Sequence, residues 1–258
     1  MKKITICLLV ILVISSCTIK EKMIINEDGS GSFSYGFDMS GIFKLGFKSK
    51  DSTKKSKVID TVFTFKEVFE KSKDSIAKLP ADERQKLKIL EKFRVNLKSN
   101  EDEKQLAFDL EYNFPSTDSL KDMVTPFESL EAMPRIGPGK KLGSLNALPD
   151  KQNKRTLFSY NYDGKVFSKK IVSPGDAKKA DKNKKKEKLG DDPFSKKMAE
   201  ILKECSYSME YHFPKKIKTV SLKNAVIAKD KKSFVMKIPM QDLPEDEEKL
   251  GFIVTFEN

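Results

Sequence analysis

The side chains that most often perform catalysis are sparse in this sequence of 258 residues, which contains 1 histidine and 3 cysteines. A Ser-His-Asp or Cys-His site would need His212, which strand alternation places on a polar face. No serine lies in a Gly-x-Ser-x-Gly elbow, and residues 137–141 lack the Gly-Lys-Ser/Thr ending of a phosphate-binding loop. One histidine does not complete a zinc-binding set. We therefore predict no catalytic residue, no metal site and no cofactor, and expect a protein that is not an enzyme.

Carboxylates offer the one enzymatic alternative, because the chain carries 38 Asp and Glu residues. Two facing carboxylates in a cleft, one with a raised pKa, would form a hydrolase of the glycosidase type. The run from Glu245 to Glu248 is the best candidate for a calcium site made only of oxygen ligands, although a solvated loop is the expectation. Tryptophan, which commonly forms platforms for sugars, is absent. A carboxylate-dependent hydrolase therefore remains the third functional alternative.

Cys17 lies where residue types and spacing predict a specific covalent modification. Lys2 and Lys3 precede an apolar run that extends from Ile4 to Ile14. A positive start, a short apolar run and small residues at a cleavage point are typical of a secretory signal peptide. As a helix, the run would cover roughly 16 Å, about half the hydrocarbon thickness of a bilayer. It therefore predicts a signal peptide over residues 1–16 and no transmembrane segment.

The four residues Ile14-Ser15-Ser16-Cys17 resemble the lipobox of bacterial lipoproteins. The resemblance implies cleavage between Ser16 and Cys17, a diacylglyceryl group on the Cys17 thiol, and acylation of the new amino group by a chain such as palmitate. Two or more acyl chains anchor a protein stably. Thr18 follows the cysteine in place of Asp, which favours the outer membrane of a diderm bacterium, on a leaflet left open. The alternative is an ordinary signal peptide that leaves Cys17 as a thiol.

The other cysteines and the net charge bound the remaining chemistry. Cys7 leaves with the signal peptide and Cys17 is modified, so we expect Cys205 to be a lone buried thiol without an intramolecular disulfide. The net charge is +12, and residues 173–192 form a lysine-rich run with few apolar residues. That run lacks the interleaved aromatic residues that stack on bases, and the chain is exported, so nucleic acid is not an expected partner. It could contact anionic headgroups, but a solvated loop is the expectation.

Period-two alternation of apolar and polar residues predicts strands with one covered face. The turn dipeptides Asp28-Gly29 and Asp163-Gly164 predict hairpins. The first turn follows a weaker alternation of Ile19, Met23 and Ile25, and the second leads into a strand over residues 166–172. The clearest apolar phases are Phe33, Tyr35, Phe37 and Met39; Phe108, Leu110, Tyr112 and Phe114; Phe158, Tyr160 and Tyr162; Tyr207, Met209, Tyr211 and Phe213; and Phe234, Met236, Ile238 and Met240.

Apolar residues at three- and four-residue spacing predict helices between these strands. We expect the helices to cover the sheet, and the alternative is that their phenylalanine stripes line a lipid pocket. Thr117 or Ser119 would cap the third helix, and Pro193 would open the fourth. The apolar stripes are Val58, Val62, Phe65, Phe69, Ile76 and Leu79; Leu87 and Leu90; Leu120, Val124, Phe127 and Leu130; and Phe194, Met198, Ile201 and Leu202.

The fold class predicted by these patterns is α+β, with antiparallel β-hairpins in a meander sheet and covering helices. We expect residues 17–258 to form a single domain with a lysine-rich loop near 173–192; residues 134–153, rich in proline and glycine, are also linker-like. The pentapeptide that begins at Glu111 matches the one that begins at Glu210 in all but its third residue, by coincidence or by duplication. Duplication would divide the chain into halves at 17–172 and 193–258.

The segment from Ile24 to Gly31 and the strand that ends at Phe213-Pro214 resemble parts of LppM-type envelope lipoproteins. That family is associated with lipid binding in the cell envelope, and it carries a C-terminal transmembrane helix that this sequence lacks. Our leading hypothesis is a membrane-anchored, non-enzymatic envelope lipoprotein that binds an envelope lipid or a protein partner. The second is a structural or assembly-scaffold lipoprotein without a small ligand. The third is the carboxylate-dependent hydrolase, placed in the envelope.

Overall fold

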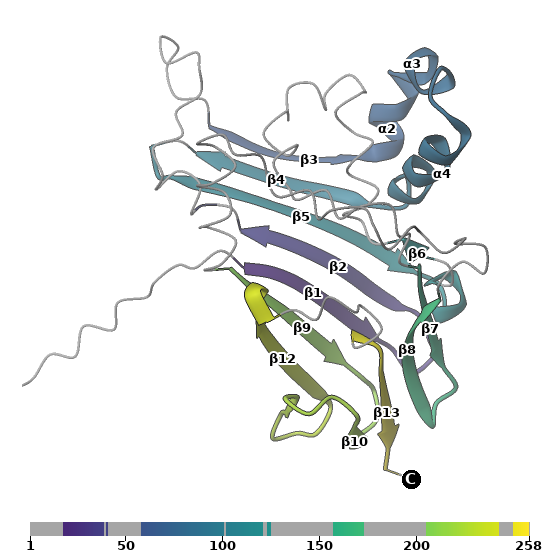
Figure 1. Ribbon diagram of the computed structural model, residues 1–258, viewed down its shortest axis with the longest axis vertical. Coiled ribbons are helices and arrows are strands. Elements are labelled where there is room, and N and C mark those ends of the chain that lie inside the picture. Colours follow the sequence, from purple (N-terminus) through teal and green to yellow (C-terminus); the bar gives the residue numbers. More distant parts are fainter. Residues whose placement is uncertain are drawn as a thin grey trace, which may run out of the picture.

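The computed structural model describes residues 18–38, 40, 58–100, 102–120, 123–124, 157–172, 205–242 and 250–257. In this part of the chain, an eight-stranded sheet and a five-stranded sheet account for most of the structure (Figure 1). The helices are few and short, so the α+β prediction holds only in the coarser form of a sheet-dominated fold. The predicted linkers at 134–153 and 173–192, the acidic run at 245–248 and the predicted fourth helix lie outside the described residues.

The large sheet has the order β11 (Val226–Ile227), β12 (Ser233–Pro239), β9 (Ser206–His212), β1 (Thr18–Ile25), β2 (Gly31–Asp38), β5 (Gln105–Phe114), β4 (Arg94–Asn100) and β3 (Ile59–Thr64). The small sheet has the order β10 (Ile217–Val220), β13 (Phe252–Phe256), β8 (Val166–Val172), β7 (Leu157–Tyr162) and β6 (Met123–Val124). The helices are α2 (Phe65–Glu70), α3 (Lys73–Ala77), α4 (Ala81–Leu90) and the 3-10 turns η1 (Thr117–Leu120) and η5 (Met240–Asp242).

Both predicted hairpins are confirmed. β1 pairs antiparallel with β2 around Asp28-Gly29, and β7 pairs antiparallel with β8 around Asp163-Gly164. The two glycines have φ angles of 79° and 80°, a left-handed conformation that glycine adopts without steric cost. The sequence therefore located these turns correctly because their backbone geometry demands particular residues.

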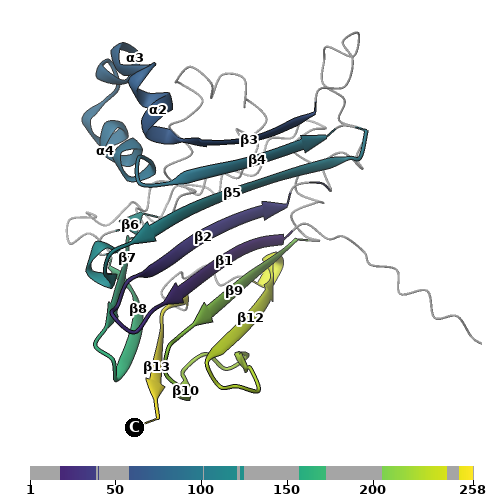
Figure 2. The same ribbon diagram turned by 180° about the vertical axis from the view of Figure 1, so that it is seen from behind.

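The centre of the large sheet contains a pairing that the sequence did not predict. β1 lies between β2, its antiparallel hairpin partner, and β9, to which it is parallel. The chain segment after residue 192 therefore contributes β9 and β12 to the same sheet as β1, and β13 to the same sheet as β8. In each sheet, strands from before and after the lysine-rich segment meet at one pairing, β1 with β9 in the large sheet and β8 with β13 in the small one (Figures 1 and 2).

The first predicted helix begins later than expected. Ile59–Thr64 forms the edge strand β3, paired with β4, so the helical prediction is wrong for Val58 and Val62. The reason is that β-branched residues dominate this segment and favour a strand once β4 offers a partner. The helix α2 starts at Phe65, where the Thr64 hydroxyl accepts a hydrogen bond from the Glu67 backbone N–H at 3.4 Å.

The second predicted helix is confirmed as α4, which buries Leu87 and Leu90. The third is wrong where it is described, because Thr117–Leu120 forms only the 3-10 turn η1 and Val124 lies in the short strand β6. Pairing of β6 with β7 provides the backbone with sheet hydrogen bonds that replace those of a helix.

The core lies between the two sheets, and the small sheet rather than the helices covers the centre of the large one. The ring centroid of Phe167 on β8 lies 5.6 Å from that of Tyr211 on β9, and the ring centroid of Phe252 on β13 lies 4.9 Å from that of Tyr211. Phe33 of β2 contacts Tyr160 of β7 at 5.9 Å. The helices α2–α4 sit beside the ends of β3 and β4 (Figure 2). The prediction of one covered and one wet face is confirmed for β1, β2, β5 and β9, whose apolar phases are buried.

Candidate functional site

A charged cluster lies within this aromatic core, and Glu21 is its centre. Glu21 has no exposed surface, because β1 alternates and places it on the same inward face as Ile19, Met23 and Ile25. Buried carboxylates are rare and need both charge pairing and hydrogen bonds. The surroundings of Glu21 are therefore the first place to look for chemistry.

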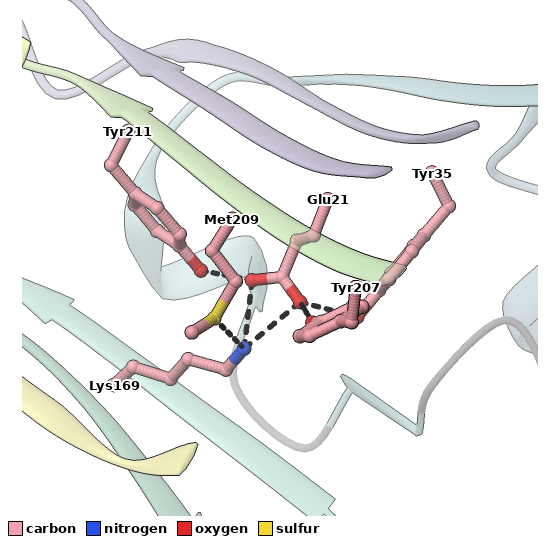
Figure 3. Close-up of polar contacts among 6 residues, drawn as sticks. All are labelled: Glu21, Tyr35, Lys169, Tyr207, Met209 and Tyr211. Carbon is pink, nitrogen blue, oxygen red and sulfur yellow. Dashed lines mark hydrogen bonds and ion pairs between the residues drawn. The ribbon is translucent and has the colours of Figure 1, made fainter. Parts of the chain in front are cut away.

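Three tyrosine hydroxyls from the large sheet donate hydrogen bonds to Glu21. Tyr35 on β2 reaches Oε2 at 2.8 Å, Tyr207 on β9 reaches the same oxygen, and Tyr211 on β9 reaches Oε1. The strand pairing explains the arrangement, because Glu21 lies directly opposite Tyr35 and Met209, and Tyr207 and Tyr211 flank Met209 on the same face. Both carboxylate oxygens are thus saturated with donors, as Figure 3 shows.

Lys169 reaches the carboxylate from the other sheet. Its Nζ lies 2.7 Å from Glu21 Oε1 and 2.9 Å from Oε2, and 3.9 Å from the sulfur of Met209 (Figure 3). The ammonium also lies 4.5 Å from the ring centroid of Phe158, a cation–π contact. Because Lys169 belongs to β8 and Glu21 to β1, the ion pair joins the two sheets at the centre of the core.

The pKa values of the cluster reflect burial opposed by pairing. Burial by itself would raise the pKa of Glu21, but the charge of Lys169 and the hydrogen bonds from Lys169, Tyr207 and Tyr211 lower it below its ordinary value. Burial lowers the pKa of Lys169, although Glu21 opposes this effect. Burial and the nearby carboxylate raise the pKa of Tyr35, Tyr207 and Tyr211 well above 10.0. Pairing with Lys169 therefore favours the ionised form of Glu21, and the surroundings of the three tyrosines favour their protonated form.

This cluster is suited to holding the sheets together, and it is closed to substrates. Glu21 and the Lys169 side chain have no solvent-exposed surface, and every Glu21 oxygen is already paired. A general acid, base or nucleophile must reach the atom with which it reacts. Here an incoming molecule would first have to separate the two sheets.

The sequence contained a signal for this cluster that period-two reasoning passed over. Glu21 occupies the apolar phase that runs through Ile19, Met23 and Ile25, and Lys169 occupies the inward phase of β8 next to Phe167. A charged residue in the covered phase of a strand needs a buried partner of opposite sign. Two charged residues of opposite sign, each in the covered phase of its strand, therefore predict a buried ion pair. Only the fold identifies which strands face one another.

His212, the only histidine, lies on the outer face of the large sheet, as predicted, and not in the core. Its Nε2 lies 2.6 Å from Glu210 Oε1. Glu210 also pairs with Lys20 at 2.7 Å and Lys22 at 3.1 Å. Partial burial opposes ionisation, but the hydrogen bonds from Lys20, His212 and Lys22 lower the pKa of Glu210 to about 2. Ser233 of β12 lies opposite His212, but the hydrogen bond of the His212 ring goes to Glu210. Among the described residues, no group of three or more metal-binding side chains occurs.

Cys205 is buried, as predicted, but it is disulfide-bonded, so the prediction of a lone thiol is wrong. Its partner lies outside the described residues, as do the predicted lipidation residue Cys17 and the cleavage residue Ser16. In a mature chain that begins at residue 17, Cys17 would be the remaining cysteine able to pair with Cys205 within the chain. A thioether and a disulfide at Cys17 exclude each other, so the chemical state of this one sulfur can be measured directly.

The described part of the chain has one further surface feature, and its helices bear on whether the chain crosses a membrane. An open hollow lies at the β1–β2 turn, lined in part by Ile24, Asn26, Asn113 and Pro115. Among the described helices, none is both long and apolar enough to cross a membrane.

Comparison with known proteins gives little additional information. No protein-family model matches this chain, and no curated protein matches its sequence. The chain is similar to the NMR structure of the folded domain of the LppM protein from Mycobacterium tuberculosis, with 9% identity, a TM-score of 0.36, and coverage of 93% of this chain and 89% of that one. A TM-score of this size does not establish a common fold, and we draw no functional conclusion from it.

Proposed function

We propose that this chain is a lipoprotein of the bacterial envelope, anchored by acyl chains on Cys17, whose body is a non-enzymatic module that binds a protein partner. The position of the lipobox carries this proposal. It ends at Cys17, and the central strand β1 begins at the next residue. The outer membrane of a diderm bacterium is the proposed location.

The non-enzymatic part of the proposal is supported by the geometry of the Glu21 cluster. This is the strongest concentration of ionisable groups in the described core, and it is sealed between two sheets with its carboxylate oxygens already bonded. Its geometry is that of a structural clamp.

A protein partner is favoured over a lipid held inside the body. In the described part, the space between the sheets is filled by rings, with Phe167 and Phe234 fully buried and in contact with Tyr211. The outer face of the large sheet instead exposes apolar side chains among charged ones, including Val62 at 48% and Val235 at 41%. Apolar groups within a polar surround are typical of protein-binding surfaces.

The anchor is tested by intact-mass spectrometry of the membrane-bound protein, with Cys17→Ala and Cys205→Ser variants beside the wild type. We expect a chain that starts at residue 17 and carries acyl chains in the wild type and in Cys205→Ser, and no acylation in Cys17→Ala. A mature wild-type chain that lacks acyl chains, or that carries a disulfide between Cys17 and Cys205, would overturn the proposed anchor.

The partner is tested by photo-crosslinking in intact cells, with a photoreactive residue at Val235 or Val62 and a control position at Val254, which is fully buried. We expect one discrete protein adduct from an outer-face position and none from Val254. Adducts with lipid alone from both outer-face positions would contradict the proposed protein partner and favour the lipid-binding alternative.

A further inference from the structure

The anchor residue and the fold are not separated by a linker. β1 begins at Thr18, so one peptide unit, about 3.8 Å between Cα atoms, joins Cys17 to the first residue of the strand. β1 is also an internal strand. Its residues pair with β2 from Thr18 to Ile25 and with β9 from Thr18 to Ile24. The backbone at Thr18 is therefore fixed by hydrogen-bonded neighbours on both sides.

The strand register defines which parts of the sheet lie beside Thr18. Thr18 lies opposite Asp38 at the end of β2 and opposite Ser206 at the start of β9. Asp38 in turn lies opposite Ala107 of β5, and Ser206 lies opposite Pro239 at the end of β12. Together with the β4–β5 turn at residues 102–104, these positions form one end of the large sheet, which we call the anchor end. Figure 1 shows it on the left, where β1 begins and the arrow of β2 ends.

We propose that the anchor end of the large sheet rests on the lipid headgroups and that the strands stand steeply on the membrane. This inference rests on the proposed function, because it requires acyl chains on Cys17. Acyl chains inserted in a bilayer hold the Cys17 backbone at the interface. With one peptide unit between Cys17 and a strand fixed on both sides, the anchor end cannot move far from that interface.

The side chains of the anchor end fit contact with headgroups better than insertion into hydrocarbon. The β4–β5 turn carries Asp102, Glu103 and Lys104, all exposed, and the adjoining strand end carries Asp38. Charges of both signs resist burial in hydrocarbon but are compatible with the polar interface. The opposite end of β1, with the turn at residues 26–30, would then lie about 26 Å farther from the membrane, since β1 has 8 residues that each rise about 3.3 Å.

Two exposed glutamates provide a matched pair for testing this orientation. Glu103 lies in the turn at the anchor end, and Glu27 lies in the β1–β2 turn at the far end. A fluorescent amino acid is placed at one or the other position in the full acylated protein, which is reconstituted in phosphatidylcholine vesicles that contain a headgroup-labelled quencher lipid. We expect the quencher to reduce emission at position 103 at least threefold more than at position 27. Equal quenching at both positions, or stronger quenching at position 27, would overturn the orientation.

A linker variant separates orientation from anchoring. Insertion of a flexible glycine-serine segment of about ten residues between Cys17 and Thr18 should leave the protein bound to vesicles but bring the quenching at the two positions within about 1.5-fold of each other. If the difference persists with the linker, the short tether is not its cause and the inference fails. If the wild type does not float with vesicles and carries no acyl chains, the proposed anchor itself is wrong, a result distinct from a failure of orientation.

Discussion

At the scale of single residues, Glu21 shows how a charge can be accommodated inside an aromatic core. Its carboxylate receives hydrogen bonds from three tyrosines and an ammonium from the opposite sheet. Removing both charges from water costs free energy, and their mutual attraction offsets this cost only when the geometry is good. The intact pair therefore adds little to stability, whereas removing one partner leaves an uncompensated buried charge and destabilises the protein strongly. Its clearest contribution is to set which face of β8 meets which face of β1.

The first prediction concerns this pair. Glu21→Gln leaves the Lys169 ammonium buried without a counter-charge, and we expect it to lower the free energy of unfolding by about 3–5 kcal/mol. The double variant Glu21→Gln/Lys169→Met should recover more than half of that loss, because no buried charge remains. Urea unfolding followed by circular dichroism measures both in the non-acylated Cys17→Ala protein. Lys22→Met, a change at a partly exposed lysine of the same strand, is the control, and additive effects of the two core changes would contradict coupling.

The second prediction concerns acid stability. The pKa of Glu21 is lower in the folded state than its ordinary value of 4.5, so the unfolded chain takes up this proton first as the pH falls. The stability that Glu21 contributes is therefore complete above pH 4.5 and is lost as the pH falls below it. Between about pH 6 and about pH 3, the wild type should lose more unfolding free energy than Glu21→Gln does. Parallel pH profiles of the two proteins would contradict this assignment.

At the scale of elements, the β1–β2 hairpin depends on close backbone approach as well as on its turn. Gly31 opens β2, and a Cβ atom there would lie 1.9 Å from the Ile24 carbonyl oxygen and 2.6 Å from Cζ of Phe114. Neither β1 nor β2 can shift easily, because both are internal strands of the sheet. A glycine between two alternating segments is therefore required here by packing and not by a positive φ angle.

The third prediction follows from this contact. Gly31→Ala should destabilise the protein by about 1–3 kcal/mol through overpacking against the backbone of β1. Gly164→Ala is the comparison, because it meets only backbone strain at φ 80° and its nearest foreign atom is Nζ of Lys215 at 3.9 Å. Thermal unfolding of the two variants gives the ranking. A larger loss for Gly164→Ala than for Gly31→Ala would show that turn strain outweighs the steric contact.

At the scale of the whole molecule, the two sheets share one core because strands from distant parts of the chain enter both. β9 and β12 complete the large sheet, and β13 pairs with β8 in the small one. Residues up to 172 therefore do not contain all the strands of either sheet. We expect the described body to unfold cooperatively.

The fourth prediction tests this cooperativity. Phe167 of β8 is fully buried, with ring contacts to Tyr211 of the large sheet at 5.6 Å and to Phe252 of the small sheet at 5.8 Å. Phe167→Ala should cost about 3–5 kcal/mol and leave a single unfolding transition seen alike by tyrosine fluorescence and circular dichroism. Ile253→Ala, at a position 46% exposed in β13, should cost less than about 1 kcal/mol. Two separate transitions in the wild type would contradict a shared core.

The sequence by itself determined the local features of this protein. Asp28-Gly29 and Asp163-Gly164 predicted two hairpins because a positive φ angle selects glycine, and alternation predicted the inward faces of β5, β9 and β12 because side chains along a strand point to opposite sides. The resemblance of residues 14–17 to a lipobox is equally local, because it rests on a short linear pattern. Helical spacing misled at Val62 and Val124, where spacing of three and four residues also occurs in strands.

Only the tertiary structure decided how these pieces meet. The parallel pairing of β1 with β9, and the meeting of Glu21 with Lys169 and the three tyrosines, join residues far apart in the chain. No short-range pattern encodes such a pairing, because the free energy that selects it comes from burying whole sheet faces against each other. The start of β1 at Thr18 and the burial of Cys205 just before β9 likewise became visible only in the structure.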